Sequence, residues 1–254
     1  MSNGNSACVQ MLNVMINNVT KDELLQKLDK GVLVTPNVDH LIKLQKDKDF
    51  YDIYTKSDWV VCDSKVLYFY SKLFGLSLKE AIPGSSFFTS YYEYHKQNDR
   101  IKIFLLGAAD GVAENAARTI NDKVGREIVV GFHSPSFGFE KNADECEDIV
   151  QIIKKSGANV VLVGVGAPKQ EKWIFKYKDS IPTVDLWLAL GATIDFEAGN
   201  ISRAPLFMQK IGMEWFYRMF VDPKRLIKRY LIDDLPIFWL LLKQRFGFYK
   251  NPFE

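Results

Sequence analysis

The 254-residue chain has few of the residues that cross-link small secreted folds or hold metal ions. It contains three histidines and three cysteines, and Cys8, Cys62 and Cys146 are far apart and form no CxxC pair. This spacing excludes a disulfide scaffold, argues against a zinc site and is typical of a reducing compartment.

Long apolar runs and a strong excess of one charge are missing as well. No apolar stretch approaches the roughly 20 residues that span a bilayer, and the polar segment Met1 to Gln10 has no apolar h-region, so we expect neither a membrane span nor a signal peptide. With 33 Lys and Arg against 31 Asp and Glu, the net charge of +2 gives no general case for a nucleic-acid partner. The 47% of apolar residues is ordinary for a globular protein with a sizeable core.

The near-neutral average hides an asymmetry along the chain. Residues 200–254 contain ten Lys and Arg against five Asp and Glu and are rich in aromatic side chains, whereas residues 1–199 have a net charge of −3. Gly199 and Pro205 interrupt the pattern where the composition changes. We therefore predict a core of residues 1–199 and a basic, helical C-terminal appendage of residues 200–254.

The core alternates short β-branched runs with segments of helical periodicity. The predicted strands lie at Val32–Val34, Trp59–Val61, Ile101–Leu106, Ile128–Val130, Val160–Val163 and Leu186–Leu190, and predicted helices include 21–30, 41–56, 111–123 and 143–156. This alternation predicts an α/β fold, a Rossmann-like parallel sheet flanked by helices.

Small and polar residues follow these strands, where a ligand binds in open α/β sheets. Gly107-Ala108-Ala109 and Gly191-Ala192-Thr193 are examples. Tight turns need glycine whatever they bind, but six such turns favour a nucleotide-type ligand. The G-x-G-x-x-G and Walker A fingerprints are both absent, which argues against the alternative of a nucleotide-dependent oxidoreductase or epimerase.

Four stretches, in order, resemble one family. They are Thr35-Pro36-Asn37 with Leu44 to Asp47, Gly166-Ala167-Pro168-Lys169-Gln170-Glu171-Lys172-Trp173, Gly191 to Gly199 with Arg203-Ala204-Pro205, and Glu214 to Arg218 with Pro223, Arg225 and Arg229. Together they resemble the WecG/TagA/CpsF glycosyltransferases over nearly the whole chain. The chain departs from the family pattern at Cys62-Asp63-Ser64, where P-D-G is common, and at Ser86, where an acid is common.

The resemblance implies an inverting bacterial glycosyltransferase of polysaccharide or cell-wall synthesis. Such an enzyme moves a hexose, an N-acetylhexosamine or its uronic acid from a UDP-sugar to a polyprenyl-diphosphate-linked sugar, without a metal or other cofactor. Because Ser86 stands where an acid is common in the family, a second alternative is an inactive, membrane-associated scaffold with a glycosyltransferase fold.

Inverting transfer needs a base for the acceptor hydroxyl, and Asp63 is a carboxylate at the end of a strand. The resemblance places the catalytic acid there; the alternative is an Asp that caps the next helix. Thr35 and Asn37 are suited to orienting sugar hydroxyls or an acetamido group beside the base, unless Asn37 or Asp39 serves only as a helix N-cap.

Binding of UDP is expected at a second set of residues. The turn at Gly107 and Ala108 can admit the diphosphate or ribose, and Gly191 lets backbone approach a ligand. Gln170 and Asp195 are candidates for polar contacts, although Asp195 is equally suited to the uracil N–H or to capping a turn. Lys169 either binds phosphate or pairs with a neighbouring Glu.

The leaving diphosphate needs a cationic partner. Asp47-Lys48-Asp49 has the form of a D-x-D metal motif, but we place it inside the predicted helix 41–56, as solvated surface. The arginines Arg218, Arg225 and Arg229 are spaced to share one helix face, provided that Pro223 does not bend the helix; their alternatives are lipid headgroups or solvent.

The last segment combines Leu235 to Leu242 with Lys243, Arg245 and Lys250. Basic residues beside Trp and Phe fit a helix in an anionic membrane interface, while the alternative is a last core helix or an oligomer contact. We therefore expect a cytoplasmic enzyme that is bound to the inner face of the bacterial cell membrane. The oligomer-contact alternative leaves a homo-oligomer open.

Overall fold

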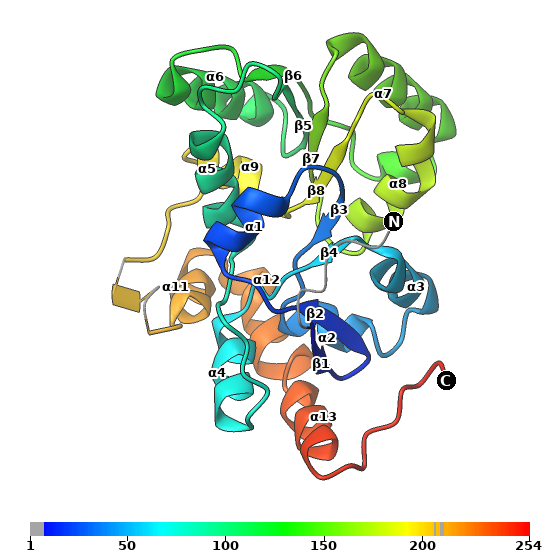
Figure 1. The fold of residues 1–254 in the computed structure, drawn as a ribbon, viewed down its shortest axis with the longest axis vertical. Helices are drawn as coiled ribbons and strands as arrows, with labels where there is room; N and C mark the ends of the chain where they lie inside the picture. The colour runs from blue at the N-terminus through cyan, green and yellow to red at the C-terminus, as the bar shows by residue number, and fades with distance from the viewer. Residues whose placement is uncertain (1–7, 206, 209–210) are drawn as a thin grey trace.

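The fold is a parallel sheet covered by helices on both faces, seen in a computed structural model (Figure 1). The structure describes residues 8–205, 207–208 and 211–254. The six strands run in the order β4-β3-β8-β7-β5-β6, and every pairing between them is parallel. Their bounds are β3 Gly31–Val34, β4 Trp59–Val60, β5 Ile103–Gly107, β6 Val129–His133, β7 Val160–Gly164 and β8 Leu186–Ala189. The predicted sheet and all six of its strands are confirmed.

Alternate residues of each strand enter two separate cores. Val32 and Val34 of β3 pack into one core and Leu33 into the other, as expected for side chains that alternate across a strand. One face is covered by α1 (Lys21–Lys27), α5 (Gly84–Tyr94), α6 (Val112–Val124) and α9 (Thr193–Glu197). The other face is covered by α2 (Val38–Lys43), α3 (Lys48–Lys56), α7 (Ala143–Ser156) and α8 (Lys169–Tyr177), with a hairpin of β1 (Cys8–Met11) and β2 (Val14–Asn17). This hairpin was not predicted from the sequence.

The predicted helix 41–56 is wrong as a single element. Helix α2 ends at Lys43, and α3 begins at Lys48 after a turn. Asp47 is the N-cap of α3, because its Oδ1 accepts from the Phe50 N–H at 3.0 Å. Asp47 therefore lies outside the helix in which the sequence analysis placed it.

The C-terminal helices pack at the end of the sheet near α2 and α4 (Figure 1). They are α11 (Glu214–Val221), α12 (Pro223–Lys228), the π-helix η3 (Arg229–Asp233) and α13 (Pro236–Arg245), and α4 is Lys65–Leu73. The short 3-10 helices η1 (Phe139–Lys141) and η2 (Lys178–Ser180) lie elsewhere in the chain. Ile237 and Leu241 of α13 are buried in the core, and the Tyr70 hydroxyl of α4 donates to the Leu241 carbonyl at 2.6 Å. The tail is thus fastened to the body along one side.

The opposite side of the tail exposes apolar side chains. Trp239 is 63% and Phe246 is 68% exposed, and Leu235, Phe238 and Phe248 are also exposed. Within the described ranges, no helix is long and apolar enough to cross a membrane.

Candidate active site

A cavity of about 1000 Å³ lies between the carboxyl ends of the strands and the C-terminal helices. Turns after β3, β4, β7 and β8 contribute to its wall, as does the first turn of α5. It brings together seven of the predicted residues: Thr35, Asn37, Asp63, Gln170, Gly191, Arg218 and Arg229. These residues come from both the core and the tail, so the cavity spans the predicted boundary between them.

Asp63 lies in this cavity just after β4. Its backbone N–H donates to the Pro36 carbonyl at 3.0 Å, which joins the turn after β4 to the turn after β3. Its Oδ1 accepts from the Gly84 N–H of α5 at 2.8 Å. Asp63 does not cap the next helix, because Ser64 is the N-cap of α4 and its Oγ accepts from the Leu67 N–H.

The surroundings of Asp63 make its proton hard to lose. Burial raises the pKa of Asp63 to about 6, with a further increase from Glu214, against the opposing effects of the Gly84 N–H and of Arg218 and Arg229. A partly buried carboxylate with that pKa accepts a proton near neutral pH, which is the property of a general base.

Thr35 and Asn37 lie beside Asp63, after β3. Thr35 is buried, and its side chain lines the cavity. Asn37 is the N-cap of α2, because its Oδ1 accepts from the His40 N–H at 3.1 Å, and Arg229 Nη2 lies 3.5 Å from the same oxygen. The helix-cap alternative for Asn37 is therefore confirmed, and the groups that it can turn toward a ligand are its amide N–H bonds.

Gln170 connects two of the turns that form the cavity wall. Its Oε1 accepts from the Gly166 N–H after β7 and from the Gly191 N–H after β8, both at 3.1 Å. Its Nε2 donates to Glu171 Oε1 at 2.8 Å. Burial raises the pKa of Glu171 to about 7. Gln170 thus fixes the spacing of two turns, a role that the sequence analysis did not foresee.

Four residues that were candidates for binding UDP are not among the described residues that line the cavity: Gly107, Ala108, Asp195 and Lys169. Gly107 ends β5, and a Cβ there would lie 2.6 Å from the Gly164 carbonyl oxygen, so the close approach of two strand ends accounts for this glycine. Ala108 follows with a φ of 61°. Asp195 is in α9, and its carbonyl accepts from the Asn200 N–H at 3.0 Å. Lys169 places its ammonium 5.4 Å from the centre of the Phe137 ring.

The three arginines do not share one helix face. Arg218 is in α11, Arg225 in α12 and Arg229 at the start of η3, because the helix breaks at Asp222 before Pro223. Arg218 and Arg229 nevertheless both line the cavity. The side chain of Arg225 lies outside what the structure describes.

Carboxylates surround Arg229. Its Nη2 lies 3.4 Å from Asp39 Oδ2, and its Nε lies 3.8 Å from Asp234 Oδ2. Burial raises the pKa of Asp234 to about 6 although Arg229 opposes the shift. These acids and Glu214 of α11 were not predicted as parts of the cavity wall, although Glu214 opens one of the motifs that resemble the family.

Lys48 and Asp49 of the D-x-D triplet are exposed, as predicted, but Asp47 is used in packing. Asp47 accepts from Lys172 Nζ at 2.7 Å, an ion pair that joins α3 to α8. Among the residues that the structure describes, no three His, Cys, Asp or Glu side chains are grouped to hold a metal ion.

A parallel sheet with a cavity at the carboxyl ends of its strands is typical of α/β proteins that bind small ligands. The comparison with known proteins is more specific: residues 9–251 match the model of the Glycosyl transferase WecG/TagA/CpsF family, and the chain belongs to this family.

Three similar curated proteins are each named N-acetylglucosaminyldiphosphoundecaprenol N-acetyl-beta-D-mannosaminyltransferase. The protein from Bacillus spizizenii is 32% identical over 78% of this chain and 74% of its own length. The Bacillus subtilis protein is 27% identical over 84% of this chain and 80% of its own length, and a Staphylococcus aureus protein is 24% identical over 92% and 91%. The resemblance seen in the sequence is thereby confirmed.

Proposed function

We propose that this protein is an inverting glycosyltransferase of bacterial cell-surface polysaccharide synthesis. The donor is UDP-N-acetylmannosamine, and the acceptor is N-acetylglucosamine carried on a polyprenyl diphosphate. The names of the relatives support the acceptor and the N-acetylmannosaminyl group that is transferred, and UDP as its carrier is our proposal. The observation that carries the proposal is the Asp63 carboxylate, with its pKa raised to about 6, in a cavity large enough for a nucleotide sugar.

Asp63 takes the proton of the acceptor hydroxyl. As the oxygen of that hydroxyl attacks the anomeric carbon, the bond from that carbon to the UDP oxygen breaks, and the proton moves to Asp63. Attack from the face opposite the leaving group inverts the configuration. The amide N–H bonds of Asn37 and the hydroxyl of Thr35 orient the acetamido group or hydroxyls of the sugar beside Asp63.

Arg218 and Arg229 stabilise the charge that develops on the departing UDP. Both guanidinium groups line the cavity and are permanently charged, and the geometry of a guanidinium matches a phosphate. Asp39 and Asp234 hold Arg229 in place before the substrate arrives. We propose that transfer needs no metal, so an excess of EDTA leaves the rate within about twofold of the untreated enzyme. A strict requirement for a divalent cation would contradict this part of the proposal.

We propose that the enzyme works on the inner face of the cell membrane, and the exposed apolar side of the tail supports contact with lipid. Phe238, Trp239 and Phe246 are exposed beside Lys243 and Arg245, a combination that suits an anionic lipid interface. A lipid-linked acceptor would then meet the cavity at the membrane surface.

The proposal is tested by a donor screen with an N-acetylglucosamine diphosphate on a short polyprenyl chain as acceptor. Release of UDP from each UDP-sugar is measured with and without this acceptor. We expect acceptor-dependent release that is fastest with UDP-N-acetylmannosamine. If no donor gives acceptor-dependent release, the proposal fails and the inactive scaffold is favoured. If another UDP-sugar gives the fastest release, the glycosyltransferase assignment stands and only the identity of the donor sugar changes.

A further inference from the structure

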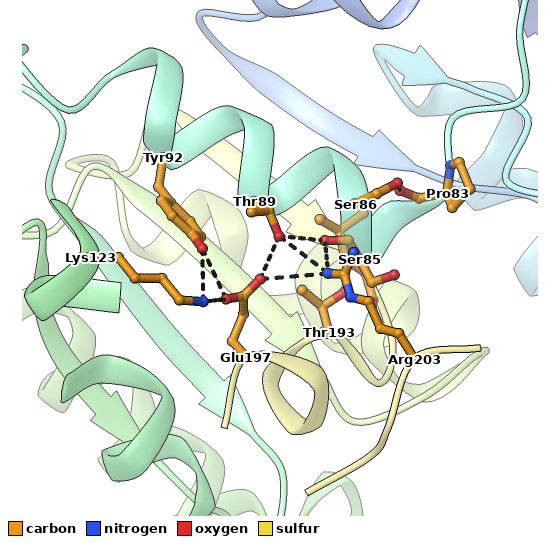
Figure 2. Close-up of polar contacts among 10 residues, drawn as sticks. Pro83, Ser85, Ser86, Thr89, Tyr92, Lys123, Thr193, Glu197 and Arg203 are labelled. Carbon is orange, nitrogen blue, oxygen red and sulfur yellow. Dashed lines mark hydrogen bonds and ion pairs between the residues drawn. The ribbon is translucent and has the colours of Figure 1, made fainter. Parts of the chain in front are cut away.

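A buried carboxylate lies outside the cavity, at the junction of the core and the tail. Glu197 ends α9, and its side chain is 2% exposed. An ionised group in this position is unfavourable unless several donors surround it. The donors are present: Thr89 Oγ1 is 2.6 Å from Glu197 Oε1, and Tyr92 Oη and Lys123 Nζ are each 3.0 Å from Oε2 (Figure 2).

These donors come from separate parts of the fold. Thr89 and Tyr92 belong to α5, and Lys123 belongs to α6. Burial and the charge of Glu197 raise the pKa of the Tyr92 hydroxyl, so it remains a donor. Glu197 therefore ties α5 to α6 and α9 through one side chain.

Arg203 adds the segment that leads into the tail. Its guanidinium lies 3.8 Å from Glu197 Oε1, and its Nη2 donates to Thr89 Oγ1 and to the Ser85 carbonyl, both at 3.2 Å (Figure 2). The contact with Ser85 reaches the first turn of α5. The same arginine thus fixes both the beginning of α5 and the start of the C-terminal segment.

The first turn of α5 is the part of the helix that enters the cavity. Gly84, Ser85 and Ser86 line the wall, and the Gly84 N–H donates to Asp63 Oδ1 at 2.8 Å. Gly84 is also packed tightly, since a Cβ there would lie 3.0 Å from the Leu190 side chain. One helical turn therefore separates the Asp63 carboxylate from the contacts that Thr89 and Arg203 make with Glu197.

We propose that Glu197, acting through Thr89 and Arg203, is a positioning residue that holds the first turn of α5 against the Asp63 carboxylate. The effect of Glu197 on kcat rests on the proposed function. The effect of Glu197 on the titration of Asp63 does not depend on any substrate. The Gly84 N–H favours the charged form of Asp63. When the contacts of Glu197 are lost, the first turn loosens, that hydrogen bond weakens, and the titration midpoint of Asp63 moves to higher pH.

The test compares two substitutions at Thr89 that differ in whether the hydroxyl is kept. Thr89→Val removes the hydroxyl that links Glu197 to Arg203, whereas Thr89→Ser retains it. The Asp63 carboxyl is titrated by ¹³C NMR without substrate, and its resonance is assigned by its loss in Asp63→Asn. We expect a higher midpoint in Thr89→Val and in Glu197→Gln than in the unmodified protein, and an unchanged midpoint in Thr89→Ser.

The kinetic arm uses UDP release from the full-length protein. We expect kcat to fall by about ten- to a hundredfold in Glu197→Gln, with the KM for the donor changed less than threefold and the acid limb of the pH profile moved upward. A loss of thermal stability with an unmoved Asp63 midpoint in both Glu197→Gln and Thr89→Val would overturn the inference. If the unmodified protein releases no UDP, the proposed function fails while the NMR titration still decides this point.

Discussion

At the scale of single residues, Asp63 is held where an ionised side chain is unfavourable and where a base is useful. Burial and Glu214 raise its pKa, while one backbone N–H and two arginines lower it. The result is a carboxylate that titrates near pH 6 rather than near the ordinary value for Asp. The raised pKa of Asp63 determines the pH dependence of the reaction and contributes to the pH dependence of the free energy of unfolding.

The rate of transfer depends on pH because only the deprotonated form of Asp63 can act as the base. We predict that kcat falls as the pH is lowered through about 6, because Asp63 then becomes protonated. An Asp with an ordinary pKa would keep the rate constant down to about pH 4. Initial rates of UDP release measured between pH 4.5 and 8.5 distinguish the two, and a flat profile across this range would contradict the assignment of Asp63 as base.

The stability effect has the opposite sign to that of a salt-bridged Asp. The pKa of Asp63 is about 6 in the folded protein, against 3.8 for an ordinary Asp side chain. Between these two pH values the folded state binds more protons than the unfolded state, so the stability falls as the pH rises. We predict that Asp63→Asn, which keeps an acceptor for the Gly84 N–H, raises the free energy of unfolding by about 1–3 kcal/mol at pH 7.5 and by little at pH 4. Urea unfolding at the two pH values measures this, and an equal change at both would refute the electrostatic explanation.

The location of residues at strand ends was predictable only in part, because residues after β3 and β4 lie in the cavity whereas Gly107 and Ala108 at the end of β5 do not line it. Asp63, Thr35 and Asn37 each follow β3 or β4, and the structure places all three in the cavity. Carboxylates such as Asp39 and Asp234 could not be predicted in the same way. They matter because they lie beside Arg229, and no local pattern in the sequence indicates that contact.

At the scale of the elements, Gln170 holds the turns after β7 and β8 at a fixed spacing. Its buried Oε1 accepts from two backbone N–H groups, and these groups lose their acceptor in Gln170→Met. We predict that this substitution lowers the free energy of unfolding by about 2–4 kcal/mol and raises the KM for the donor. Gln151→Met, the same change at an exposed position on α7, is the control, and equal effects of the two substitutions on stability and KM would contradict the role of Gln170.

The elements that were predicted wrongly show where periodicity is insufficient. The apolar pattern continues from Leu41 to Lys56, but Asp47 caps a new helix in the middle of it. Arg218 and Arg229 are correctly spaced for one helix face, yet Pro223 starts a separate helix between them. In both cases the spacing of side chains fits one continuous helix, but a residue that favours a helix start divides the segment into two helices.

At the scale of the whole molecule, the alternation of strands and helices was enough to predict the sheet and its two covered faces. The cavity was not predictable to the same degree. Its wall combines turns after four strands, the first of them at Thr35, with helices of the tail that begin only at Glu214. The tail is both a packed element and an exposed one. Ile237 and Leu241 are buried, whereas Trp239 and Phe246 are exposed.

The exposed side of the tail gives a prediction for membrane binding. Trp239→Glu combined with Phe246→Glu places two negative charges on a surface that would face anionic lipid, so we expect at least about tenfold weaker sedimentation with phosphatidylglycerol vesicles. Phe137→Glu, at a fully exposed position before η1, is the matched control and should bind the vesicles as the unmodified protein does. If the double variant still sediments fully, the tail is not the membrane anchor.

The central claim is that the Asp63 carboxylate removes the acceptor proton during glycosyl transfer. The most direct measurement compares kcat for acceptor-dependent UDP release between the unmodified protein and Asp63→Asn, with the affinity for UDP determined by calorimetry on the same samples. We predict that kcat falls at least about 100-fold while the affinity for UDP changes less than threefold. Turnover within a few-fold of the unmodified protein, with UDP still bound, would contradict this account.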